Sequence, residues 1–426
     1  MATAEAEAAA APKPARAGGF RTSLTAFETP GFRFLWLSNL LFFNAQFIFV
    51  ASQQWLIVNL TDSRTLLGLA GFAQGVAMLV LSPFAGVVTD RVSRRLILMV
   101  ARLCLVALCL TVAVLEVAGL IEVWHVVLVA LVAGLTIGSA QPATQTFVFD
   151  VVPRDRAANA VALNATTTGM SQMIGPSLGG ILIAAFGVAA GYFVSAGFYL
   201  CGALVLVVIT VLAPRPAPAE RRSVRSELRE GAREALANPV TRWALFFVLS
   251  SIFGASIQAL RPVFAKEVFD VGAVGFGLMS AVFGLGSVTG AIVTANLSYR
   301  VPNKGAMLLT GGLIFFGAFL LYSGSPWYGT TLVCEFVMGF GGTMWNASGF
   351  PLIQMAVPEA VRGRVMSLVF MIMTGAFMGQ LLAGFLADHI GPRWTLFACG
   401  SVALGIHAVG LINRTFLRAA AKVSYE

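Results

Sequence analysis

Residues 86–95 read GVVTDRVSRR, three arginines and one aspartate between two long apolar runs. The apolar runs cover residues 65–89 and 96–118. Each exceeds the roughly 20 apolar residues that cross about 30 Å of hydrocarbon as a helix. A charged seam between two such runs predicts two membrane-spanning helices joined by a short loop at one face of the membrane.

The composition of the whole chain supports the same interpretation. Of its 426 residues 58% are hydrophobic and 11% are charged, and the mean hydropathy is +0.84. A water-soluble protein of this size needs more polar surface. The alternating strands of a membrane barrel are absent from the sequence, whereas long apolar runs satisfy their backbone groups as helices. The sequence therefore predicts an all-α integral membrane protein.

Breaks rich in charge, glycine or proline divide the chain into about twelve expected spans. These are residues 33–59, 65–89, 96–118, 123–149, 157–185, 190–213, 242–264, 272–297, 304–323, 327–355, 361–386 and 392–413. An even number of spans places both termini on the same side of the membrane.

The basic residues predict which side that is. If both termini are cytoplasmic, all but four of the 28 Lys and Arg lie in cytoplasmic loops, tails or adjoining helix ends. The exceptions are Arg64, Arg261, Lys266 and Arg393. This asymmetry follows the positive-inside rule, so we expect cytoplasmic termini.

A polar insertion, PRPAPAERRSVRSELREGAREALANP at 214–239, separates two sets of six spans. Its proline-rich start is typical of a linker, and its Arg/Glu-rich remainder is either a short helix along the cytoplasmic face or a solvated connector. The expected domains are a disordered cytoplasmic tail (1–26), a six-helix bundle (27–213), the linker (214–239), a second six-helix bundle (240–416) and a cytoplasmic tail (417–426).

The two halves also repeat at an offset of 205 residues. Gly134 matches Gly339, and GVVTD at 86–90 aligns with AIVTA at 291–295, where alanine replaces the aspartate. The sequence therefore predicts a six-plus-six duplication whose acid survives in only one copy.

Twelve spans in two six-helix halves resemble the major facilitator superfamily, whose halves are parallel repeats. The seam is similar to the superfamily's loop between helices two and three, except that serine at 93 replaces a glycine. The matching residues are Gly86, Asp90, Arg91, Arg94 and Arg95.

These residues form a candidate cytoplasmic latch. Asp90 can accept hydrogen bonds from Arg94 or from a helix N-terminus, which the resemblance implies is that of helix eleven near Gly363. Such a contact forms only when the halves meet on the cytoplasmic side. Asp150 is a further expected partner of Arg94 or Arg102. Alternatively, the loop serves only to set topology.

The stretch SQMIGPSLGG at 171–180 resembles the fifth-helix element of the superfamily's exporters, with Gly175, Pro176, Gly179 and Gly180 at the matching places. Proline bends a helix, and small residues let a neighbouring backbone approach. We expect either a seal between helices five and eight or general small-residue packing.

Three further stretches resemble a bacterial branch that includes siderophore exporters and macrolide efflux pumps. They are PGFRFLW at 30–36, SAQPATQTFVFDVVPRDRAANAVAL at 139–163 and VPEAVRGRVMSL at 357–368. The resemblance implies a multi-pass protein of the bacterial inner or plasma membrane that works by alternating access. Its expected partners are protons, the lipid bilayer and a small-molecule substrate, and we expect a monomer.

Glu335 is the candidate proton carrier, because an ionisable group inside a span is costly and needs a reason. The alternative is that it simply pairs with Arg261. Uncharged polar residues are the candidate cavity lining, together with some of the 33 Phe and 14 Met, which suits hydrophobic or amphipathic substrates. The polar candidates are Asn39, Asn44, Gln46, Gln53, Gln54, Gln141, Gln145, Asn164, Gln172, Gln258, Asn346 and Gln380.

Other classes of function have little support in the sequence. The five cysteines lie in apolar runs without a CxxC pair, and no phosphate loop or nucleophile elbow is present, so we expect no enzyme activity, metal, cofactor or nucleic acid. Two alternatives to proton-coupled export stay open. One is an uptake symporter on the same fold, and the other is a membrane sensor or scaffold that transports nothing.

Overall fold

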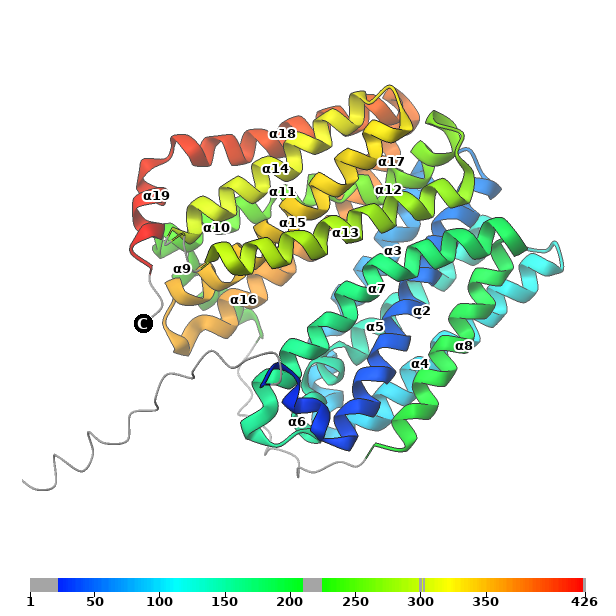
Figure 1. The fold of residues 1–426 in the computed structure, drawn as a ribbon, viewed down its shortest axis with the longest axis horizontal. Helices are drawn as coiled ribbons and strands as arrows, with labels where there is room; N and C mark the ends of the chain where they lie inside the picture. Colours follow the sequence, from blue (N-terminus) through cyan, green and yellow to red (C-terminus); the bar gives the residue numbers. More distant parts are fainter. Residues whose placement is uncertain (1–21, 210–223, 299–300, 302, 424–426) are drawn as a thin grey trace, which may run out of the picture.

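The computed structural model of the chain describes residues 22–209, 224–298, 301 and 303–423. Within these ranges all regular secondary structure is helical (Figure 1). The first half contains six long helices: α2 (Pro30–Leu60), α3 (Arg64–Arg91), α4 (Arg94–Val117), α5 (Val123–Thr146), α7 (Ala157–Phe186) and α8 (Val188–Val207). The shorter elements of this half are η2 (Thr22–Glu28), α6 (Val148–Val151) and η3 (Arg154–Arg156).

The second half has six matching units, two of which are broken helices. The first unit is α10 (Pro239–Val248), α11 (Ser250–Gly254), α12 (Ser256–Val263) and η4 (Phe264–Val268), and the fifth is α16 (Glu359–Thr374) with α17 (Ala376–Ile390). The others are α13 (Gly272–Ser298), α14 (Lys304–Gly324), α15 (Tyr328–Ala356) and α18 (Pro392–Ile412). Two short helices, α9 (Val224–Ala237) and α19 (Arg414–Ala421), flank this half.

Eleven of the described helical units are long and apolar enough to cross a membrane. The twelfth is α15, whose 29 residues pack against α13 and α14. The prediction of an all-α fold with about twelve spans is therefore confirmed. The sequence did not predict the interruptions at Leu249, Ala255 and Gly375, which divide two apolar runs into shorter helices.

The two halves repeat the same packing. In the first half α3 packs on α5 and α4 on α8, and in the second half α13 packs on α15 and α14 on α18. The turns that precede α8 and α18 are also alike. Each is a single glycine in the left-handed region, Gly187 (φ 82°) and Gly391 (φ 83°), where other L-residues are strained. This local repeat confirms the two pseudo-symmetric six-helix bundles.

The helices run between two ends of the molecule, which we call the tail end and the turn end. At the tail end lie η2, α9 and α19, and at the opposite, turn end lies the α2–α3 turn, Thr61–Ser63 (Figure 1). A large hydrophobic cluster toward the turn end joins both halves, for example through the stacked rings of Trp55 and Phe276. The clusters at the tail end each belong to one half, such as that around Phe32 and Phe147. The halves therefore share a core toward the turn end.

The helix that begins in the polar insertion packs on the second half. Helix α9 lies against α16 and α10, and its Ala235 is fully buried. A β-carbon on Gly231 would come within 2.9 Å of the carbonyl oxygen of Arg364. The Arg/Glu-rich part of the insertion is thus a packed helix at the tail end. Its Pro-rich part, residues 214–223, lies outside the described residues.

Backbones of the two halves touch where α7 meets α13 and where α3 meets α17. A β-carbon on Gly180 would lie 2.6 Å from the carbonyl oxygen of Ala273 and 2.8 Å from the Cα of Gly277. On the other side of the interface, a β-carbon on Gly68 would lie 2.4 Å from the carbonyl oxygen of Gln380. Only glycine permits these two approaches.

We expect Gly180→Ala to destabilise the protein by about 1–3 kcal/mol, because the added methyl group overpacks the α7–α13 contact. Gly169→Ala is the matched control on the same helix, since nothing lies within 4 Å of a β-carbon there. The control should be neutral or stabilising, because alanine favours helix over glycine. Thermal unfolding in detergent measures both; equal midpoints for the two variants would contradict the tight contact.

Candidate functional site

A cavity of about 290 Å³ lies between α7 of the first half and several helices of the second. Its wall is almost entirely from α11–α15 and α17, and the first half contributes Gln172. The lining residues are Gln172, Ser251, Gly254, Ala255, Ile257, Gln258, Phe283, Ser287, Gly312, Phe315, Phe316, Gly342, Thr343, Trp345, Asn346 and Ala376.

The lining combines aromatic rings with uncharged hydrogen-bonding groups. Phe315 and Phe316 contact each other edge to face, with centroids 4.9 Å apart, and Trp345 lies on the facing helix α15. Amides and hydroxyls occur on several sides of the wall, and none of its residues is charged. Such a wall suits an organic molecule with aromatic faces and polar substituents.

A buried ion pair lies directly behind this wall. The Nε atom of Arg261 is 2.8 Å from Oε1 of Glu335, and its Nη2 atom is 3.0 Å from Oε2. Glu335 is fully buried, and Arg261 is 5% exposed. The two parallel contacts are the bidentate geometry that makes arginine–carboxylate pairs strong. The sequence left two roles for Glu335, proton carrier and partner of Arg261. The structure shows the pairing with Arg261.

The ion pair touches the cavity through two lining residues. The guanidinium of Arg261 lies over the ring of Phe283, 5.2 Å from its centroid, and Nη1 is 3.5 Å from Oε1 of Gln258. A change in the charge of Glu335 would therefore alter the restraint on two side chains of the cavity wall.

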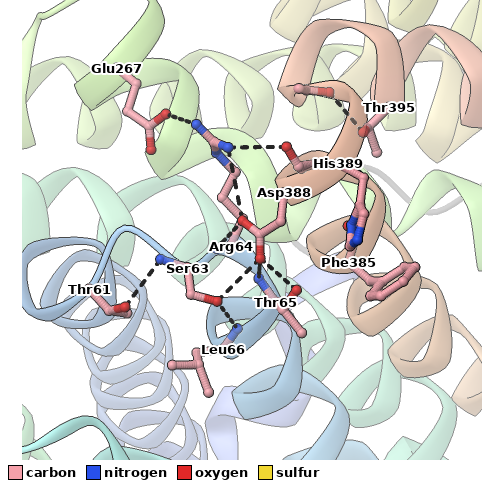
Figure 2. Close-up of polar contacts among 12 residues, drawn as sticks. Thr61, Ser63, Arg64, Thr65, Leu66, Glu267, Phe385, Asp388, His389 and Thr395 are labelled. Carbon is pink, nitrogen blue, oxygen red and sulfur yellow. Dashed lines mark hydrogen bonds and ion pairs between the residues drawn. The ribbon is translucent and has the colours of Figure 1, made fainter.

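The turn end is closed by polar contacts between the halves, shown in Figure 2. Asp388 of α17 accepts hydrogen bonds from the backbone nitrogens of Arg64 and Thr65, at 2.8 and 2.9 Å. The side chain of Arg64 pairs with Glu267 of η4 and donates to the carbonyl of Ala387 at 3.1 Å.

Two more contacts extend this closure along α2. The Nζ atom of Lys266 donates to the carbonyl of Val58 at 2.6 Å. The Nε2 atom of Gln54 donates to the carbonyl of Gln258, a cavity residue, at 3.0 Å. Hydrogen bonds that join the two halves thus lie on the turn-end side of the cavity.

The predicted latch is only partly described. Arg94 forms an ion pair with Asp150, as the sequence suggested, and Arg95 donates to the carbonyls of Val207 and Ile209. All of these contacts lie within the first half. Gly86, Asp90 and Arg91 lie in the last turns of α3, but the contacts of these three positions fall outside the described part of the structure.

Arg102, the other expected partner of Asp150, lies elsewhere. It is buried among α2, α4 and α8, where its guanidinium donates to Ser38 Oγ, Asn39 Oδ1 and the carbonyl of Gly202. These neutral acceptors hold three helices of the first half together.

The fifth-helix element lies in α7, between α2 and α13. Gly180 faces α13, whereas a β-carbon on Gly175 would lie 2.6 Å from the Cβ of Phe47 on α2. The carbonyl oxygen of Pro176 approaches Gly277, and Gly179 lies over Ala51 and Ile48 at ordinary contact distance. The element thus packs α7 on both halves near the shared core.

The predicted polar lining separates into groups. Gln258, Asn346 and Gln172 line the cavity, whereas Asn44 donates to the carbonyl of Leu40 and to Ser171 Oγ between α2 and α7. Gln53 is buried and Gln145 exposed, and Gln141 borders a separate small cavity beside Arg102. Sequence reasoning expected some Phe in the wall but did not single out its aromatic residues or Thr343. Only Thr343 and Trp345 had a signal, their proximity to Asn346 in GGTMWN.

Twelve spans in two repeated six-helix bundles are the architecture of membrane transporters of the major facilitator superfamily. A family model described as transmembrane secretion effector matches residues 21–423, and the chain belongs to this family. The superfamily resemblance seen in the sequence is therefore confirmed. The family and its relatives are transporters rather than enzymes.

Individual relatives agree with this membership. The enterobactin exporter EntS of Escherichia coli O1:K1 / APEC is 26% identical over 358 residues, 83% of each chain. A solved bacterial homolog of the human lysosomal transporter Spinster has a TM-score of 0.71 at 16% identity, over 94% of this chain and 99% of that one. A D-xylose-proton symporter has a TM-score of 0.68 at 14% identity, over 93% and 100%. The two structures share the fold.

We expect Glu335→Ala to lower stability by about 3–5 kcal/mol, because it leaves the buried guanidinium of Arg261 without a counter-charge. The double change Arg261→Met with Glu335→Leu should recover most of this loss, since it removes both charges and keeps the volume. Thermal unfolding in detergent measures each variant. A double variant no more stable than Glu335→Ala would contradict the pairing.

Proposed function

We propose that the protein is a secondary transporter of the bacterial inner membrane that exports amphipathic, aromatic small molecules in exchange for protons. The observation that carries this proposal is the cavity, whose uncharged polar and aromatic wall belongs to the second half apart from Gln172, together with the polar contacts that join the halves at the turn end. The similarity to an enterobactin exporter supports export of a siderophore-like or drug-like molecule. The main rival is uptake of a small organic solute with protons.

The tail end is assigned to the cytoplasm by its basic residues. Arg94, Arg95, Arg362 and Arg364 lie there, whereas Arg64 and Lys266 lie at the turn end, as the positive-inside rule requires. Both termini are then cytoplasmic, and the structure is closed toward the periplasm. The division into two bundles joined by residues 214–239 and flanked by tails 1–26 and 417–426 belongs to the same proposal.

Proton coupling is assigned to Glu335. A proton on this carboxyl would remove the charge that holds Arg261, and Arg261 contacts the cavity residues Gln258 and Phe283. The protonated state would therefore release two side chains of the substrate wall. Substrate binding and protonation of Glu335 would then compete, because both depend on how Gln258 and Phe283 are held. Such competition between substrate and proton is what exchange requires.

In the opposite, outward-open state the cytoplasmic side must close. We assign this closure to the latch of Gly86, Asp90, Arg91, Arg94 and Arg95, with Asp90 meeting the N-terminus of α16. The pair Arg94–Asp150 anchors the start of α4 beside the latch. The glycines at 175, 179 and 180 would let α7 stay sealed against α13 while the halves rock.

Transport in inverted membrane vesicles tests the proposal. With the vesicle interior more acidic than the bath, we expect uptake of some members of a panel of aromatic dyes and antibiotics, accompanied by proton release into the bath. Glu335→Gln should abolish the pH dependence of transport. The absence of uptake and proton release for the whole panel would overturn export, and acid-driven uptake into intact cells would instead favour the symporter.

The aromatic wall predicts a defined loss of affinity. Phe315→Ala and Trp345→Ala should each weaken substrate binding about 2- to 12-fold, the equivalent of one aromatic contact of about 0.5–1.5 kcal/mol. Phe397→Ala is the control, because that ring is exposed on the outer surface of α18. Binding is read as thermal stabilisation by the transported compounds; unchanged affinity in both cavity variants would remove this cavity as the substrate site.

A further inference from the structure

The α2–α3 turn lies between two helix ends of opposite polarity. The last carbonyls of α2 and the first amides of α3 have no partner within their own helix, and they carry partial negative and positive charge respectively. The carbonyls therefore need hydrogen-bond donors, and the amides need acceptors, from other parts of the protein or from water. Ser63 supplies one weak acceptor, 3.4 Å from the nitrogen of Leu66.

The carbonyl of Ile57 accepts from the backbone nitrogen of Thr61 in the same turn, whereas further partners come from the opposite half of the molecule. The carboxylate of Asp388 accepts from the backbone nitrogens of Arg64 and Thr65, and from the hydroxyls of Thr65 at 2.6 Å and Ser63 at 3.2 Å (Figure 2). It thus acts as an N-terminal cap of α3, although it belongs to α17.

Two basic side chains, Lys266 and Arg64, donate to carbonyl groups at helix C-termini. Lys266, next to Glu267 in η4, donates to the carbonyl of Val58 in the last turn of α2. Arg64 of α3 donates to the carbonyl of Ala387 in the last turn of α17. Asp388 therefore lies at the N-terminus of α3, and the cationic groups of Lys266 and Arg64 lie at the C-termini of α2 and α17, the favourable arrangement at each. Helices α3 and α17 cap each other.

We propose that this reciprocal capping, the turn-end clamp of Arg64, Lys266, Glu267 and Asp388, is the device that holds the periplasmic side closed. The clamp deepens the alternating access proposed above, because opening the turn end separates α17 and η4 from the α2–α3 turn and removes every one of these caps. Water then has to replace them. The clamp therefore biases the protein toward the closed turn end without contacting substrate.

The geometry indicates that capping, rather than a direct ion pair, is the main role of Asp388. The nearest guanidinium nitrogen of Arg64 is 3.9 Å from Asp388 Oδ1, whereas four backbone or hydroxyl donors lie within 3.2 Å of this carboxylate. Asparagine caps helices about as well as aspartate, and alanine does not. At position 388 asparagine keeps one accepting oxygen without the charge, whereas alanine keeps neither, so the two substitutions grade the loss of the cap.

The test is the distance between spin labels on the two halves at the turn end. Phe186 and Trp327 are exposed there, 76% and 71%, on the first and second halves. Labels are attached at Phe186→Cys and Trp327→Cys after replacement of the five native cysteines, and distances are measured by pulsed electron paramagnetic resonance in lipid nanodiscs.

We expect Asp388→Ala to raise the ratio of long to short distances about tenfold, the effect of losing one cap. Asp388→Asn keeps one of the two acceptor oxygens and should give a ratio between those of the unsubstituted protein and Asp388→Ala, because its amide nitrogen cannot accept from a backbone nitrogen. Glu122→Ala is the matched control, because this turn-end carboxylate caps α5 within its own half and accepts from Trp124. It should leave the distances unchanged.

Three outcomes would overturn the clamp: an Asp388→Ala distribution like the unsubstituted one, an Asp388→Asn distribution like that of Asp388→Ala, or an equal shift with Glu122→Ala. Lys266→Met, which removes the cap of α2, should open the turn end as well if Asp388→Ala does not fold. The readout does not involve substrate. A distance shift in a protein that transports nothing would uphold the clamp and reject the proposed function.

Discussion

Close backbone contact between the two halves at the turn end is the constraint on which the rest of the structure depends. Gly180 against α13 and Gly68 against α17 allow the helices to touch there. Lipid supplies no hydrophobic force to bring helices together, so such contacts rely on packing and on hydrogen bonds between spans. The halves share a core and a set of polar bonds at this end, and one of these bonds reaches Gln258 of the cavity wall.

The charges of the molecule are distributed according to this arrangement. A buried charge in a span is expensive, and the pair of Arg261 and Glu335 meets that cost by mutual bidentate contact. Its position behind Gln258 and Phe283 gives the pair a route to the substrate wall. At the membrane surface, charges serve helix ends instead, as Asp388 does for α3. We propose the first set for coupling and the second for gating.

Much of the fold could be predicted because the bilayer constrains it strongly. Apolar runs long enough to span the bilayer predicted the twelve helical units. The 205-residue repeat, which aligns Gly134 with Gly339, predicted the two halves. Of the polar residues named from the sequence, Gln258 and Asn346 lie in the cavity wall, and Arg94 of the charged loop pairs with Asp150. Asn44 does not line the cavity, because its amide nitrogen donates to the carbonyl of Leu40 and to Ser171 Oγ between α2 and α7.

The remaining features have no local signature in the sequence. Phe315 and Trp345 resemble the many aromatic residues that face lipid, since both environments are apolar. Asp388, two residues from the end of its span, resembles an ordinary solvated acid, and its partners are more than 300 residues away in sequence. Such contacts depend on how the two bundles pack against each other. The hydrophobic periodicity and composition of the sequence do not predict that packing.

The most direct test of the central claim is the side from which the cavity can be reached. Thr343→Cys in a cysteine-free protein places a thiol in the cavity wall, and a membrane-impermeant maleimide is applied to inverted vesicles and to intact spheroplasts. The account predicts rapid labelling in inverted vesicles and slow labelling in spheroplasts without substrate. Equal rates from both sides, or faster labelling in spheroplasts, would contradict a cavity closed at the turn end.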